Sequence, residues 1–185
     1  MKIAEGAAAT AVAVIYSVSL SAVFGASAAY HRGAWSPRAR RWMKRLDHSL
    51  IFVLIAGSYT PISVLVLQGP WEAVVLSVVW TMAAVGITLK MARPDGLSVL
   101  TATLYMVMGW FALVAAPQLV RGLEPAELIL LVSGGLLYTA GAIVFATRRP
   151  DPRPEVFGYH EIWHTFMVAA ATCHYAMILL VLRAA

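Results

Sequence analysis

Apolar runs of membrane-spanning length dominate this chain of 185 residues. A helix rises 1.5 Å per residue and the hydrocarbon core of a bilayer is about 30 Å thick, so about 20 apolar residues are enough to cross it. Runs of this kind occur at residues 7–30, 46–67, 71–89, 97–117, 127–146 and 158–182. Each run therefore predicts one transmembrane helix.

The connections between these runs are short and contain helix-breaking residues. They hold Ser36-Pro37, Gly69-Pro70, Pro94-Asp95-Gly96, Glu124-Pro125 and the stretch from Pro150 to Pro154. None has room for a separate soluble domain. We therefore predict an all-α fold, a polytopic integral membrane helical bundle with six spans that forms a single transmembrane domain over residues 1–185.

Composition supports this prediction and excludes a water-soluble globule. Hydrophobic residues make up 61% of the chain and charged residues only 12%, whereas soluble domains carry about 25% charged residues. The net charge of +5 is typical of some nucleic-acid-binding proteins, but here the basic residues lie in the short connections. They are expected to orient the chain in the membrane, with no nucleic acid as partner.

The basic residues alternate between the two sides of the predicted bundle. Eleven of the 14 fall in the first, third and fifth connections: Arg32, Arg38, Arg40, Arg41, Lys44 and Arg45, then Lys90 and Arg93, then Arg148, Arg149 and Arg153. Lys2, Arg121 and Arg183 lie on the other side. Because short basic loops stay in the cytoplasm, these three connections are predicted to be cytoplasmic in a cell membrane, with both termini outside.

A secretory signal peptide is the alternative interpretation of the N-terminal run. Lys2 precedes an apolar stretch, and Ala26-Ser27-Ala28 is typical of a cleavage site. The apolar stretch is longer than the roughly 7–15 residues of a signal peptide core, however, and six basic residues follow it. These features favour a retained transmembrane helix.

Ionisable residues inside the spans gather at their predicted cytoplasmic ends. Ser27 and His31 lie four residues apart at the end of the first span, which places them on one helix face. Asp47 opens the second span, and His160 and His164 repeat the four-residue spacing at the start of the sixth. Such groups are costly within a bilayer and usually mark a function or a polar network.

These residue types predict a zinc site. Zinc is commonly held by three protein ligands and a water, and two histidines at i and i+4 reach one metal from a single helix face. His31, His160 and His164 supply three nitrogens. Asp47 would balance the charge of the metal and hold its water, which makes it a candidate catalytic residue together with Ser27.

Structural interpretations of the same residues remain open. Buried His, Asp and Ser also form hydrogen bonds between helices without any metal, and Ser27 is of a type that packs helices closely. His48 points about 100° away from Asp47, and His174 lies about 15 Å deeper, where we expect a buried polar contact. Glu161 either interacts with the positive end of its helix or acts as a general base, as in the His-Glu-x-x-His motif.

Other features of the spans have structural interpretations. Gly57-Ser58-Tyr59-Thr60-Pro61 predicts a kink in the second span, with freed carbonyl groups bonded by neighbours. Gly134, Gly135 and Gly141 predict close helix packing. Trp35, Trp42 and Trp71 are typical of a membrane interface.

Four stretches together resemble a known family. They are Ser-Ala-Ala-Tyr-His at 27–31, Arg-Leu-Asp-His-Ser at 45–49 with Ile-Ala-Gly-Ser-Tyr-Thr-Pro at 55–61, Gly-Gly-Leu-Leu-Tyr-Thr-Ala-Gly at 134–141, and Phe-Gly-Tyr-His-Glu-Ile-Trp-His at 157–164. The chain thereby resembles the haemolysin III branch of the progestin and adiponectin receptor family. The resemblance implies zinc binding by His31, His160 and His164, with Ser27 and Asp47 nearby. It also implies a seven-helix fold, of which this chain supplies six helices and lacks the first.

Three functions follow as hypotheses. The family and the similar membrane ceramidases imply zinc-dependent hydrolysis of a lipid amide or ester, with a membrane lipid as substrate. A second hypothesis is a membrane-lipid sensor or receptor, in which zinc joins the spans and no reaction occurs. A third, a cytolytic pore, is implied by the family name, although the spans carry few polar side chains to line a channel.

Overall fold

A computed structural model describes residues 2–93 and 98–185, with side chains at 6–93 and 99–185. The elements are α1 (Lys2–Arg32), α2 (Pro37–Leu65), α3 (Pro70–Ala92), α4 (Ser98–Trp110), the 3₁₀ helix η1 (Phe111–Ala115), α5 (Ala116–Gly122), α6 (Pro125–Thr147) and α7 (Tyr159–Ala184). The described residues form no strand, only one isolated bridge between Arg153 and Phe157. Six helical stretches among them are long and apolar enough to cross a membrane. The predicted all-α, six-span, multi-pass membrane fold is confirmed.

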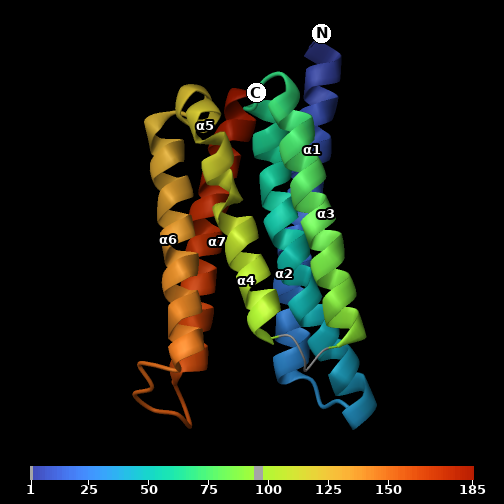
Figure 1. The fold of residues 1–185 in the computed structure, drawn as a ribbon, viewed down its shortest axis with the longest axis vertical. Coiled ribbons are helices and arrows are strands. Elements are labelled where there is room, and N and C mark those ends of the chain that lie inside the picture. Colours follow the sequence, from blue (N-terminus) through green and yellow to red (C-terminus); the bar gives the residue numbers. More distant parts are fainter. Residues whose placement is uncertain (1, 94–97) are drawn as a thin grey trace. The chain divides into compact units, whose positions relative to one another are not determined.

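The chain divides into two compact units. Unit 1 comprises residues 1–118 with Ala185, and unit 2 comprises residues 119–184. In unit 1, α2 packs against both α1 and α3 (Figure 1). Phe52 and Ala56 on α2 are completely buried. In unit 2, α6 packs along α7, drawn in orange and red in Figure 1.

Helix α2 begins nine residues earlier than the predicted start at residue 46, because the arginine-rich connection is itself helical. Ser36 is the N-cap, and its hydroxyl oxygen accepts a hydrogen bond from the backbone N–H of Ala39 at 3.3 Å. Pro37 follows at the first helical position, where its missing N–H costs nothing. The predicted span was defined by its apolar residues, so it did not include the polar helical turns that precede residue 46.

The fourth span is broken, whereas the sequence predicted one continuous run over 97–117. Helix α4 passes into the 3₁₀ helix η1, and α5 extends the span to Gly122. Pro117 contributes to the break, because its ring crowds the carbonyl four residues earlier and it has no N–H to donate. Residue 97 and the Pro94-Asp95-Gly96 connection lie outside the described residues.

A tyrosine of α2 supplies a second cause of the break. The hydroxyl of Tyr59 accepts the backbone N–H of Ala112 at 2.7 Å and donates to the carbonyl of Met108 at 2.8 Å. In a continuous α-helix that N–H would bond to that carbonyl. Tyr59 therefore inserts into the backbone hydrogen-bond ladder of span four, which is a recognised cause of helix distortion.

Two of the three predicted packing glycines bring α6 close to α7. A Cβ at Gly134 would overlap the ring of His174, and one at Gly141 would overlap Phe166. Nothing lies within 4 Å of a Cβ at Gly135, so the prediction was wrong there. The expected polar contact of His174 is confirmed, because its Nε2 donates to the carbonyl of Leu131 at 3.3 Å.

Helix α2 continues through Pro61 to Leu65. The hydroxyl of Thr60 donates to the carbonyl of Ala56 at 2.9 Å and accepts the indole N–H of Trp80 from α3 at 3.2 Å. This chain of hydrogen bonds ties α3 to α2 beside the proline. The carbonyl that Pro61 frees is that of Gly57, four residues earlier, so the predicted kink and the bonding of freed carbonyl groups stay predictions.

Candidate metal centre

The start of α7 is fixed by two acidic side chains. Glu161 accepts the backbone N–H of Gly158 at 2.9 Å, and Asp151 accepts that of Tyr159 at 3.0 Å. Both carboxylates satisfy N–H groups that the first helical turn leaves without intrahelical acceptors. Of the two interpretations of Glu161, this geometry favours the interaction with the helix N-terminus.

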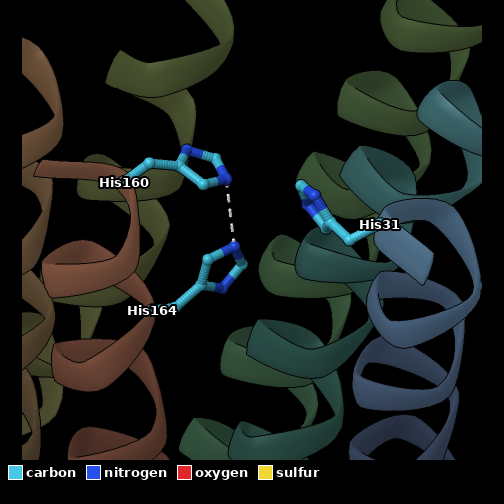
Figure 2. A group of neighbouring side chains, drawn as sticks. All are labelled: His31, His160 and His164. Atoms are coloured by element: carbon cyan, nitrogen blue, oxygen red, sulfur yellow. Dashed lines mark hydrogen bonds between the residues drawn. The ribbon is translucent and has the colours of Figure 1, made fainter. Parts of the chain in front are cut away.

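The two histidines of α7 converge on one point. His160 and His164 lie one turn apart, and their Nε2 atoms are 3.1 Å from each other (Figure 2). The ring centroids are 4.7 Å apart and the ring planes are almost perpendicular, at 81°. Both rings are partly buried. Two imidazole nitrogens aimed at the same place are what a shared ligand requires.

Aromatic side chains surround this pair. The ring of Trp163 lies 5.5 Å from that of His160 and 4.5 Å from that of His164, measured between centroids. Phe145 of α6 lies 5.9 Å from His160 and 5.0 Å from Trp163. Such packing restricts the rotamers of both histidines, so the two nitrogens are held in place before any ligand arrives.

Three more of the predicted site residues meet in unit 1. Ser27 and His31 occupy the last two turns of α1, and His31 is drawn on that helix in Figure 2. The side chain of Ser27 is hydrogen-bonded to Asp47 of α2, and His31 interacts electrostatically with the same carboxylate. Asp47 is only 9% exposed. An imidazole, a hydroxyl and a buried carboxylate thus form a polar group where α1 ends.

Sequence reasoning missed the contacts of two tyrosines that join α2 to the fourth span. Tyr105 of α4 donates its hydroxyl hydrogen to the carbonyl of His48 at 2.7 Å, one residue after Asp47. Tyr59 lies farther along α2, where its hydroxyl inserts into the backbone hydrogen bonds of span four. Tyr59 stands in the motif that the sequence drew attention to, but Tyr105 lies in an otherwise apolar run with no signal to mark it.

Most of this chain is similar in sequence to known proteins. The family described as "Haemolysin-III related" matches residues 1–175. Hemolysin-3 of Bacillus cereus is 32% identical over 176 residues, which cover 95% of this chain and 77% of the relative. The Hemolysin-3 homolog of Bacillus subtilis is 30% identical over 165 residues, covering 89% and 74%.

A more distant relative connects the chain to a receptor group. The adiponectin receptor protein of Drosophila melanogaster is 30% identical over 177 residues, which cover 82% of this chain and 38% of the receptor. The family match and the two bacterial relatives each extend over most of the chain. The chain belongs to the haemolysin III family, a branch of the progestin and adiponectin receptor family.

Proposed function

We propose that this chain is a zinc-dependent hydrolase of lipid amide or ester bonds that serves membrane lipid homeostasis, with His31, His160 and His164 as the zinc ligands. The observation that carries the proposal is the convergence of two imidazoles on α7. Their Nε2 atoms are 3.1 Å apart. Two nitrogens bound to one tetrahedral zinc ion are separated by about 3.3 Å, given Zn–N bonds of about 2.0–2.1 Å.

The donor set also fits zinc rather than a harder cation. Each of the three histidines offers one ring nitrogen. Imidazole nitrogens suit zinc, whereas magnesium and calcium prefer oxygen ligands. Three protein ligands leave a fourth position for water, which is the arrangement of catalytic zinc sites.

His31 enters the proposal through the alternation of the spans. The first span ends, and the sixth begins, on the side of the membrane that carries most of the basic residues. We propose that this side is cytoplasmic and that the three imidazoles share one level there. One zinc ion would then bind all three imidazoles.

Zinc, when bound, supplies a Lewis acid that makes water acidic enough to react near neutral pH. Asp47 is the group that accepts the proton, because it is the carboxylate beside His31. Ser27 holds Asp47 in position through their hydrogen bond. A second role for Ser27, the stabilisation of an oxyanion, would require this hydroxyl to turn away from Asp47.

The proposal is tested by hydrolysis of a lipid amide with a fluorescent acyl chain, using detergent-purified protein. His31→Ala and Asp47→Asn should each lose turnover by at least about a hundredfold while the protein stays folded. His174→Gln is the matched control, because it changes a histidine outside the site and keeps a donor for Leu131. Normal turnover in both site variants would refute the hydrolase.

The same preparations discriminate a membrane-lipid sensor. If wild-type protein contains zinc and yet hydrolyses neither the amide probe nor an ester analogue, the metal joins the spans without a reaction. The sensor hypothesis then replaces the hydrolase.

A further inference from the structure

The first turns of α2 carry an unusual density of positive charge. Five basic residues occupy positions 38–45, and no acidic residue lies between Arg32 and Leu46. Arg38 and Arg40 lie in the first turn of the helix, where the backbone dipole is positive and cations are unfavourable. In Figure 1 these turns lie at the lower end of unit 1. An anionic partner would offset this local repulsion.

Three of the arginines share one helix face with a tryptophan. Arg38, Arg41, Trp42 and Arg45 follow the i, i+3, i+4, i+7 spacing that aligns side chains on a helix. Arg38 and Arg41 are exposed, and Trp42 is 50% exposed. The apolar side chain of Leu46, 45% exposed, extends this face. We call these four residues, Arg38, Arg41, Trp42 and Arg45, the arginine face.

The guanidinium group of Arg45 has donor capacity that the protein does not use. It stacks over the ring of Trp42, with its carbon 4.7 Å from the ring centroid. Its Nε is buried and has no hydrogen-bond acceptor. Asp47 does not accept a hydrogen bond from this Nε on the same face, because Asp47 lies about 140° around the helix from Trp42. Its carboxylate is hydrogen-bonded to Ser27 instead.

Charge alone does not account for this arrangement. A segment that only orients the chain needs positive charge, which lysine supplies as well as arginine. Guanidinium groups differ from lysine because they bind phosphate oxygens with two parallel hydrogen bonds. Indole rings favour the headgroup level of a bilayer. The arginine face combines both features beside an apolar span.

We propose that the arginine face binds the headgroup phosphate of anionic phospholipids in the leaflet that this end of α2 meets. The guanidinium groups contact the phosphate, and Trp42 lies among the neighbouring headgroups. This lipid is a bound partner on unit 1, and the proposal does not depend on zinc or on hydrolysis.

The test is native mass spectrometry of the full chain in detergent, titrated with phosphatidylglycerol and, separately, with phosphatidylcholine. Wild-type protein should retain phosphatidylglycerol in preference to phosphatidylcholine. Each basic residue near an anionic surface strengthens binding by roughly fivefold, so the triple change Arg38→Gln, Arg41→Gln, Arg45→Gln should weaken retention by about a hundredfold. Excess inorganic phosphate should not displace the lipid, and displacement would point to a site for free phosphate instead.

Two further variants make the test specific. The first removes three charges elsewhere, as Arg148→Gln, Arg149→Gln, Arg153→Gln, and should retain the lipid as wild type does. The second replaces the same three arginines of the face by lysine, which keeps the charge but removes bidentate binding, and should weaken retention about threefold or more. Equal losses in the two glutamine variants, or wild-type retention in the lysine variant, would overturn the proposal.

Discussion

The insertion of Tyr59 into span four leads to a prediction that can be tested on stability. Tyr59→Phe removes one oxygen and leaves the ring in place. The deleted hydroxyl accepts the N–H of Ala112 and donates to the carbonyl of Met108, with the carbonyl of Gly109 also within 3.1 Å. The change therefore deprives one backbone donor and one acceptor of their partner.

The surroundings of these groups determine the cost. Tyr59 is 9% exposed and Met108 is fully buried, so water does not replace the lost partner. A buried polar group left without a partner costs about 1–3 kcal/mol, and two such groups give a loss of about 2–6 kcal/mol. For a chain of this size, 1 kcal/mol shifts the melting temperature by about 2–4 °C, so we expect a decrease of about 4–24 °C.

Tyr105→Phe is the matched control. Its hydroxyl donates a hydrogen bond to the carbonyl of His48 at 2.7 Å. Losing a single hydrogen bond costs about 1 kcal/mol, or about 2–4 °C. Both variants can be melted in detergent while a thiol-reactive dye reports exposure of Cys173, the one cysteine in the chain. If Tyr59→Phe has the same melting temperature as wild type, the backbone groups of span four form their hydrogen bonds without Tyr59. Our explanation of the break would then be wrong.

Three further predictions concern unit 2. Gly134→Ala should lower the melting temperature by several degrees, because the added Cβ overlaps the ring of His174 on α7. Gly135→Ala should leave the melting temperature unchanged, and equal effects of the two changes would contradict the packing of α6 against α7. Glu161→Ala should cost about 1 kcal/mol through loss of the helix cap, with lipid hydrolysis by the folded protein unchanged; loss of turnover would make Glu161 catalytic. Zinc content should fall when the pH is lowered, because imidazoles bind metal only when neutral; a constant content would argue against histidine ligands at His160 and His164.

The sequence predicted the spans well because bilayer crossing depends on length and apolarity, which are local properties. It failed at Pro37 because the polar turns of α2 are helical for another reason, the Ser36 cap and a well-placed proline. Apolarity cannot reveal where a helix extends beyond the bilayer. The capping residues were present in the sequence and would have identified the earlier start.

The break in span four and the choice between two glycines lay beyond local patterns. Tyr59 and Ala112 are 53 residues apart, so their hydrogen bond depends on how α2 packs against the fourth span. Gly134 and Gly135 are identical neighbours, and only the rotation of α6 against α7 decides which one contacts the ring of His174. Pro117 was a visible signal, but the predicted run ended there.

The candidate site was predictable in its parts. The i, i+4 spacing of His160 and His164 fixed their common helix face, and the structure adds that their nitrogens are at ligand spacing. Sequence reasoning grouped Ser27 and His31 with Asp47, and the structure gives them direct interactions. It could not give the hydrogen bond between Ser27 and Asp47, because that depends on the packing of α1 against α2.

The central claim of the proposed function is that His31, His160 and His164 hold one metal ion, and zinc content tests it most directly. Elemental analysis of detergent-purified wild type should give one zinc per chain. His31→Ala should lose as much zinc as the double change His160→Ala, His164→Ala, although it leaves the α7 pair intact. Full zinc in His31→Ala, or equal zinc in wild type and the double variant, would contradict the claim.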